Sequence, residues 1–352
     1  MSITYKYDYI IIGQGLAGSI LAYTLIEDFG QNVLVIDNNH ERSSSVIAAG
    51  IYNPITGKRR VKTWMADQIF PFMEEFYQKI EAKLGTKISY KHTVYRPFDS
   101  IAEQNQWTAQ SADIGYDSFV AVSNPKPELS GIIDDKFGGI EPAFSGWIDC
   151  PVFLDSIKKY LIEKAFYIQK KVTNEDIPQL LAQCNHKIIF CEGHQAAFNP
   201  LWGWLPWLLA KGEIIKIKNP DLNIQNIINK SVFICPTANK DEYRVGSTFA
   251  WDELNTIMPS QAAKDEIVAK LNAFFQAPYQ IIDQQVGVRP SVQDRRPFVG
   301  LHPDNDRVGI FNGFGSKAVS MAPYFAHNFG DFLVNESSLH QDADIQKRLK
   351  FQ

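Results

Sequence analysis

Apolar residues near the N-terminus occur in two kinds of pattern. Short continuous apolar runs occupy residues 9–12 and 33–36, and the stretch between them has helical spacing. A continuous run of this length, bounded by glycines or polar residues, is typical of a strand buried on both faces of a parallel sheet. The pattern therefore predicts a β-α-β unit that ends at Asp37.

Similar patterns continue along the chain. Helical spacing predicts further helices over about 63–84, 152–164, 260–275 and 316–332. Strand-like runs lie at 167–172, 187–193, 213–217, 231–235, 243–248, 287–290, 297–300 and from 309. Residues 87–140 are expected to be short strands and loops, and the polar residues 335–352 have only a weak helical pattern. Pro71 is expected to kink or split its helix, and Pro323 fits best in the first turns of the last one.

The turn of the first unit carries candidate chemistry. It is Gly13-Gln14-Gly15-Leu16-Ala17-Gly18, and the acidic residue Asp37 follows about twenty positions later. Gly13 permits a tight turn, Gly15 allows the backbone to approach a pyrophosphate, and Gly18 allows close packing of helix on strand. The helix N-terminus favours phosphate, and Asp37 can accept hydrogen bonds from ribose hydroxyls. This arrangement predicts a dinucleotide site without distinguishing NAD from FAD.

Composition limits the other possibilities. The chain has 352 residues, of which 45% are hydrophobic and 21% charged, and its net charge is −4. No overall basic field is expected to attract nucleic acid or acidic lipid. The N-terminus enters the first strand without a signal-peptide pattern, so we expect a cytoplasmic protein. The Trp-rich run 201–210 is too short to span a bilayer, and either core packing or a membrane-facing or partner-facing patch explains it.

Metal and hydrolase chemistry has no support in the sequence. The four cysteines, Cys150, Cys184, Cys191 and Cys235, form no C-x-x-C pair, and the seven histidines are dispersed. No H-E-x-x-H or G-x-S-x-G motif occurs. We therefore expect no metal site and reduced, buried thiols.

A set of motifs in a fixed order resembles one known family. The stretches are GQGLAGSILAYTL with Asp37, SSSVIAAGIYNP, GGIEPAFSGWIDCPVFL, CEGHQ, AKGEIIKI, YRVGSTFAW, GVRPSVQDRRPFVG and NGFGSKAVSMAP. Together they resemble the D-amino-acid oxidase superfamily of FAD-dependent oxidoreductases, most closely its glycine oxidase and sarcosine oxidase branches. The resemblance runs from residue 9 to about residue 333.

The resemblance implies a fold class and a domain arrangement. The class is α/β, with an FAD-binding Rossmann-type domain of the glutathione-reductase-like βαβ kind interleaved with an α+β substrate domain built on an antiparallel sheet. The FAD-binding domain is expected to comprise residues 1–85, 146–211 and 283–352. The substrate domain is expected to comprise residues 86–145 and 212–282.

The resemblance also implies roles for individual residues. Arg289 of the G-x-R-P motif is expected to hold a substrate carboxylate, with a surface salt bridge as the alternative. Lys317 is expected near the flavin ring, as a second carboxylate contact, a promoter of oxygen reduction, or a plain ion pair. FAD is expected to contact Gly13, Gly15, Leu16, Ala17, Gly18, Asp37, Asn38, Ser44, Ser45, Ala48, Ala49, Gly50, Val172, Gly193, Gly313, Phe314, Gly315, Ser316 and Lys317.

Two absences refine the expected cofactor chemistry. No second G-x-G-x-x-G unit is present for a nicotinamide, so electrons are expected to reach FAD directly from an organic substrate and to leave to oxygen or a quinone. Residues 291–300 contain no cysteine where sarcosine-oxidase relatives attach their flavin, so FAD is expected to bind non-covalently.

The resemblance leaves three functions open. The first is FAD-dependent oxidation of the C–N bond of an amino acid or secondary amine, by hydride transfer to flavin N5 and hydrolysis of the imine. The second is oxidative trimming of a carboxymethylaminomethyl group on tRNA wobble uridine. The basic run 58–62 could then touch phosphate, although the net charge makes tRNA an unlikely partner and DNA is not expected. The third is a non-catalytic binding protein on the same fold.

Overall fold

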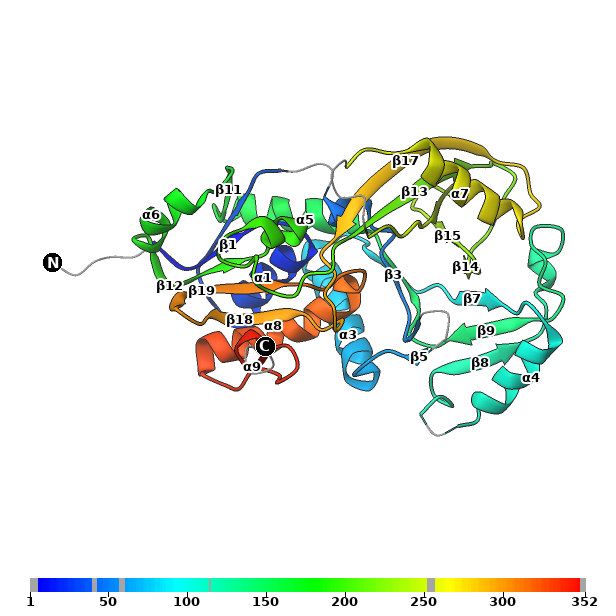
Figure 1. The fold of residues 1–352 in the computed structure, drawn as a ribbon, viewed down its shortest axis with the longest axis horizontal. Coiled ribbons are helices and arrows are strands. Elements are labelled where there is room, and N and C mark those ends of the chain that lie inside the picture. Colours follow the sequence, from blue (N-terminus) through cyan, green and yellow to red (C-terminus); the bar gives the residue numbers. More distant parts are fainter. Residues whose placement is uncertain (1–5, 40–42, 57–60, 114, 252–256, 349–352) are drawn as a thin grey trace.

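The computed structural model describes residues 6–39, 43–56, 61–113, 115–251 and 257–348. Two sheets lie side by side along the long axis, and the described ends of the chain both lie in the part built on the six-stranded sheet (Figure 1). The segments of each sheet alternate along the sequence, so neither part is one continuous stretch of chain.

The six-stranded sheet has the order β11-β2-β1-β12-β19-β18. Neighbouring strands from β11 to β19 pair in parallel, and only β18 is antiparallel to its neighbour. The bounds are β1 Tyr7–Ile12, β2 Val33–Asp37, β11 Tyr167–Gln169, β12 Cys184–Phe190, β18 Phe298–His302 and β19 Asn305–Asn312. The predicted β-α-β unit is confirmed, with helix α1 (Leu16–Glu27) between β1 and β2.

Both faces of this sheet are buried, as the continuous apolar runs predict. Ile11 belongs to the core formed with α1, α3 (Ala66–Leu84), α5 (Cys150–Glu163) and α8 (Ala318–Asn335). Its neighbour Ile10 points to the opposite face, where α6 (Ile177–Leu181) and the Trp-rich run pack. Pro71 and Pro323 lie inside continuous helices, so the expected split at Pro71 does not occur.

The Trp-rich run 201–210 packs against the second face of the sheet. Trp202 is fully buried beside the Phe190 ring, and the ring of Trp207 meets that of Phe298 edge to face at 4.8 Å. Only Leu208 in this run counts among the large exposed hydrophobic side chains. Most of the run is therefore core.

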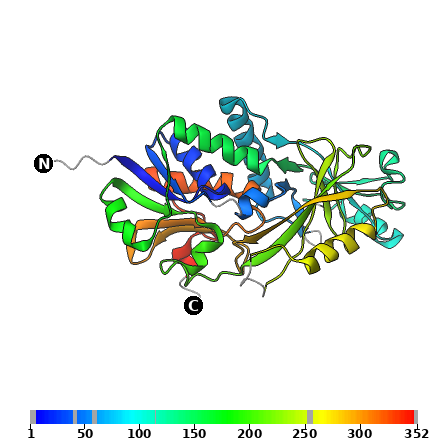
Figure 2. The same ribbon diagram turned by 90° about the horizontal axis from the view of Figure 1, so that it is seen from above.

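The eight-stranded sheet has the order β17-β13-β16-β15-β14-β7-β9-β8. Every neighbouring pair is antiparallel except β14 with β7. The bounds are β7 Val94–Pro97, β8 Val120–Ser123, β9 Gly139–Pro142, β13 Ala210–Lys218, β14 Ile227–Asn229, β15 Phe233–Pro236, β16 Glu242–Gly246 and β17 Gln280–Arg289. Helix α7 (Gln261–Asn272) covers one face, as Figure 2 shows from above.

One detail differs from the sequence-based expectation. Residues 87–140 include a helix, α4 (Ile101–Gln110), where only strands and loops were expected. Ser100 caps α4, but Trp107 is its only buried residue, so the helix has no apolar periodicity that a sequence reading could detect. The expected division into two domains stays a prediction, and β17 runs through its boundary between residues 282 and 283.

Shorter elements complete the fold. A three-stranded sheet contains β3 (Ile51–Tyr52), β10 (Gly146–Ile148) and β6 (Ser89–Tyr90), and β4 (Ile55–Thr56) pairs with β5 (Val61–Lys62). The remaining elements are α2 (Ser44–Ile47), α9 (Ile345–Arg348) and the 3₁₀ turns Pro127–Leu129, Asn174–Asp176 and Gly193–Phe198.

Within the described ranges, no helix has the length and apolar character needed to cross a membrane.

Candidate active site

The glycine-rich turn between β1 and α1 is held by close backbone contacts. Gly13 has a φ of +103°, and a β-carbon there would lie 2.5 Å from the Cys191 carbonyl oxygen. A β-carbon on Gly18 would lie 1.8 Å from the Gly13 carbonyl oxygen. Side chains are therefore excluded at both positions, and α1 packs directly on the turn that it follows.

Asp37, at the end of β2, is tied to the same turn. Its carboxylate accepts hydrogen bonds from the backbone N–H of Gln14 at 2.8 Å and of Asn39 at 2.6 Å. The Gln14 side chain in turn donates to the Leu154 carbonyl at 2.9 Å and to Ser19 Oγ at 3.0 Å. The acidic residue thus fixes the loop as well as facing the cavity beside it.

A cavity of about 910 Å³ begins at this turn and extends to the end of β17. It is lined by Lys170, Lys171 and Glu175 after β11, by the glycine turn, and by Arg289 and Lys317. Seventeen of the nineteen FAD contacts expected from the sequence line it: Gly13, Gly15, Leu16, Ala17, Asp37, Asn38, Ser44, Ser45, Ala48, Ala49, Gly50, Val172, Gly193, Phe314, Gly315, Ser316 and Lys317. Segments distant in sequence therefore form one elongated cavity.

Two of the proposed contact residues do not line the cavity. Gly18 packs against Gly13, as described above. Gly313 has a φ of +77°, its N–H donates to Asn312 Oδ1 at 2.8 Å, and a β-carbon there would meet Val292 and Phe298. Both glycines therefore lie behind the residues that line the cavity and allow those residues to pack closely.

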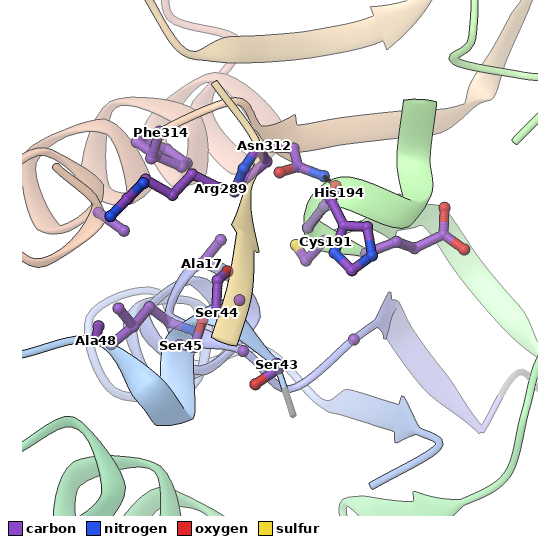
Figure 3. Close-up of a pocket in the computed structure, with 18 of the residues that line it drawn as sticks. Ala17, Ser43, Ser44, Ser45, Ala48, Cys191, His194, Arg289, Asn312 and Phe314 are labelled. Carbon is purple, nitrogen blue, oxygen red and sulfur yellow. Dashed lines mark hydrogen bonds between the residues drawn. The ribbon is translucent and has the colours of Figure 1, made fainter. Parts of the chain in front are cut away.

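Part of the run of small residues after β2 folds as the short helix α2. Ser43 caps it, and Ser45 Oγ accepts a hydrogen bond from the Leu16 N–H at 3.1 Å. Gly50 has a φ of +71°, and a β-carbon there would lie 1.9 Å from the Ile148 carbonyl oxygen. In Figure 3, Ser43, Ser44, Ser45 and Ala48 lie across the cavity from Asn312.

Arg289 is the last residue of β17, and its side chain crosses the neighbouring strand β13. Its Nη2 donates to Ser247 Oγ at 2.9 Å, and its Cζ lies 4.7 Å from the centre of the Phe249 ring. Nη1 is buried, and none of the described residues forms a hydrogen bond with it. Among the described residues, no carboxylate pairs with this guanidinium, so the expected alternative of a surface salt bridge is not found.

Burial lowers the pKa of Arg289 to about 10, so the side chain stays charged at neutral pH. A buried cation with an unsatisfied N–H group is costly unless an anion completes its coordination. Because Arg289 also lines the cavity, it is a candidate site for a carboxylate, which the guanidinium can bind through two parallel hydrogen bonds.

Lys317 precedes α8 and lines the same cavity. Its Nζ lies 3.3 Å from Thr63 Oγ1, which leaves further N–H groups available. Burial, together with the nearby charges of Arg295 and Arg296, lowers its pKa to about 8. The loop that carries Lys317 is joined to the strand end that carries Arg289 by a hydrogen bond from the Gly315 N–H to the Pro290 carbonyl at 3.2 Å.

The described acidic residues that line the cavity lie elsewhere. Asp37 is the last residue of the parallel strand β2, and Glu175 and Glu192 come after the parallel strands β11 and β12. Burial raises the pKa of Glu192, whose carboxylate accepts a hydrogen bond from Asn199. The region around Arg289 and Lys317 therefore holds positive charge without an acidic lining residue in the described part of the chain.

Several lining or supporting residues were not selected from the sequence. Asn312 donates to the Gly193 carbonyl at 2.9 Å and so joins β19 to the segment after β12. Ser247, Phe249 and Gly212 surround the Arg289 guanidinium. Only the motif letters around them, YRVGSTFAW and AKGEIIKI, offered a signal, and those letters do not show which residues touch.

Residues 8–331 match a family model described as FAD dependent oxidoreductase. The chain belongs to this family. The match covers most of the chain, including all of the cavity-lining residues named above.

Individual relatives agree with this assignment. The glycine oxidase of Bacillus subtilis (strain 168) is 20% identical over 367 residues, which cover 96% of this chain and 95% of that enzyme. Two solved structures share the fold. Iminodiacetate oxidase from Chelativorans sp. BNC1 has a TM-score of 0.75 and 17% identity, covering 94% of this chain and 96% of that one. Glycine oxidase from Geobacillus kaustophilus has a TM-score of 0.76 and 14% identity, covering 95% and 96%.

Family membership confirms the predicted fold class, the enzyme class and FAD as cofactor. The residues present fit this cofactor. The turn that excludes side chains at Gly13 and Gly18 leaves space for a pyrophosphate at the N-terminus of α1, and the cavity is long enough to reach from residues 170–175 to Arg289. Its volume lies at the upper end of the range for ligand and cofactor sites, roughly 300–1,000 Å³.

Proposed function

We propose that this FAD-dependent oxidoreductase oxidises the C–N bond of a small amino acid or secondary amine, and that Arg289 binds the carboxylate of that substrate. The observation that carries the proposal is the Arg289 guanidinium, which is charged, buried and lines the cavity that fits the cofactor, and whose Nη1 has no partner among the described residues. The names of the relatives, glycine oxidase and iminodiacetate oxidase, describe the same class of substrate.

The proposed residue roles follow from position. Gly13, Gly15, Leu16, Ala17 and Asp37 would hold the ADP half of FAD. The ribityl and ring portion would lie along Ser44, Ser45, Ala48, Ala49 and Gly50. The flavin ring would also lie beside the segment before α8, at Phe314, Gly315 and Ser316. Val172 and Gly193 would contact the adenine and pyrophosphate portions. Arg289 would fix the substrate so that its C–H bond faces the ring.

Bound FAD would supply the two-electron acceptor for this oxidation, with oxygen or a quinone as the final acceptor. In the substrate, the C–H bond next to nitrogen would break with loss of a hydride, the nitrogen lone pair would form the C=N bond, and the N–H proton would pass to water. Water would then hydrolyse the imine to a carbonyl compound and an amine, or ammonia where the substrate nitrogen is primary. Arg289 would restrict the orientation of the substrate, because a carboxylate bound to the guanidinium through two hydrogen bonds fixes the position of the adjacent carbon.

Lys317 would add a second positive charge to the same region. Its ammonium group has N–H groups beyond the Thr63 contact and no acidic neighbour among the described lining residues. We propose that it provides either a second contact to an anionic substrate or a charge that promotes oxygen reduction. Its pKa near 8 keeps a large part of the population charged at neutral pH.

The test combines FAD-loaded protein with a panel of glycine, sarcosine, D-amino acids and proline analogues under anaerobic conditions. Loss of flavin absorbance identifies the donors. Arg289→Met should then raise the KM for the best donor by a factor equivalent to about 2–5 kcal/mol, because a carboxylate would lose its charged partner in a buried site. An unchanged KM would reject Arg289 as the anchor, and the absence of any donor would reject the amine class.

The tRNA alternative gains no specific support. Residues 58–60 of the basic run lie outside the described residues, and Lys62 pairs with Asp67 at 2.8 Å. A salt-dependent gel shift with tRNA would be needed to favour it.

A further inference from the structure

We propose that Phe249 positions the substrate-binding arginine, by holding the guanidinium plane of Arg289 so that Nη1 faces the cavity. This inference rests on the proposed function, because it assigns the carboxylate to Arg289. It concerns an aromatic side chain that lies outside the cavity lining and that the sequence motifs did not single out.

The backbone around Phe249 is fixed against β13. Ala250 and Lys211 exchange two backbone hydrogen bonds of 2.9 Å, the Thr248 N–H donates to the Glu213 carbonyl at 3.1 Å, and the Glu213 N–H donates to Thr248 Oγ1 at 2.9 Å. These bonds hold residues 248–250 beside Gly212, which lies between Lys211 and Glu213. The position of the Phe249 ring is therefore set by the sheet.

Two further residues lie close to the guanidinium. At Gly212 a β-carbon would stand 2.3 Å from Nη1 and from Nη2. Cζ lies over the Phe249 ring, 4.7 Å from its centre. The bond from Nη2 to Ser247 Oγ fixes rotation within the plane. These three contacts leave Nη1 without a hydrogen-bond partner among the described residues, and we assign the substrate carboxylate to it.

Phe249 is not a core residue. It is 51% exposed, and its other ring contact is an edge-to-face contact with Trp251, which is 44% exposed. An exposed aromatic ring whose face covers a buried cation contributes a cation–π interaction and excludes water from one side of the guanidinium. Arginine suits this arrangement better than lysine, because its planar group stacks on aromatic rings.

The experiment uses FAD-loaded protein and (methylthio)acetate, a carboxylate without an amine, whose binding is followed by the change in flavin absorbance. Phe249→Leu should raise its Kd by about 3- to 30-fold, the range expected for loss of a cation–π contact. Phe249→Tyr should keep the Kd within about 2-fold of wild type. With the best amino-acid donor, Phe249→Leu should raise KM by a similar factor and leave kcat within about 2-fold.

Trp251→Leu is the matched control, since it removes an equally exposed ring that does not contact the guanidinium. It should change the Kd by less than about 2-fold. The inference is overturned if Phe249→Leu leaves the Kd within 2-fold of wild type, or if Trp251→Leu raises it as much. A third variant separates the two proposals. If Arg289→Met leaves the Kd unchanged, the proposed role of Arg289 as carboxylate anchor fails; if Arg289→Met raises it and Phe249→Leu does not, only the role of Phe249 fails.

Discussion

The guanidinium of Arg289 lies against the α-carbon of Gly212, so closely that a β-carbon at residue 212 would stand 2.3 Å from both terminal nitrogens. Arg289 starts on β17 and reaches Ser247 on the far side of β13. The missing side chain at Gly212 is what lets the arginine cross the strand between them.

Gly212→Ala should therefore displace the guanidinium without disturbing the glycine turn. We expect the affinity for (methylthio)acetate to fall by about tenfold or more, which corresponds to about 1.4 kcal/mol or more, while FAD stays bound. Flavin absorbance measures both quantities. In the Arg289→Met background the same change should have almost no further effect, because the two residues act through one contact. An additive effect in the double variant would contradict this explanation.

Asp37→Ala should weaken FAD binding. The carboxylate accepts the N–H groups of Gln14 and Asn39, and each hydrogen bond to a charged group contributes about 1.5–3 kcal/mol. Loss of the acceptor should raise the Kd for FAD by about 10- to 100-fold, measured by fluorescence of the free cofactor. Asp37→Asn keeps one acceptor oxygen and should have a smaller effect. An unchanged Kd in Asp37→Ala would separate Asp37 from cofactor binding.

Lys317 should produce a pH dependence in the binding of anions. Because burial and the charges of Arg295 and Arg296 lower its pKa to about 8, the ammonium group loses its proton as pH rises through that value. The affinity for (methylthio)acetate should therefore decrease between about pH 7 and pH 9. Lys317→Met should have lower affinity and a flat profile over the same range. A wild-type affinity for (methylthio)acetate that does not decrease between about pH 7 and pH 9 would show that Lys317 does not face the bound anion.

The same pKa has a consequence for stability. The unfolded chain keeps this lysine protonated up to about pH 10.4, so the native state binds fewer protons between about pH 8 and pH 10.4. The cost of burying the charge is present below pH 8 and is relieved as pH rises through that window. Lys317→Met should therefore be more stable than wild type in the apoprotein at pH 7, by a margin that shrinks toward pH 10. Urea unfolding at several pH values checks this.

Trp202→Ala should destabilise the protein by about 3–5 kcal/mol, because the ring is fully buried beside Phe190. Urea unfolding measures the loss. Leu208→Ala, in the same run but with an exposed side chain, should cost far less. A small effect at Trp202 would reopen the question of whether this run serves a partner instead of the core.

Local features of the fold were accessible from the sequence. The continuous apolar runs 9–12 and 33–36 correspond to β1 and β2, and the glycine turn occupies the place expected. Each of these features depends on a few neighbouring residues, because residue type and the spacing of apolar positions indicate the local backbone conformation and burial. Helix α4 is not predicted by the sequence, because its single buried residue, Trp107, gives no helical spacing of apolar positions.

The grouping of site residues required the tertiary structure. By itself the sequence determined that a dinucleotide-binding turn exists and that an arginine follows a glycine near the end of the chain. Only the pairing of β13 with β17 on one side and with residues 248–250 on the other brought Gly212, Arg289 and Phe249 together. The physical reason is that strand pairing joins residues far apart in the chain, and no local pattern encodes which side chain crosses which neighbouring strand.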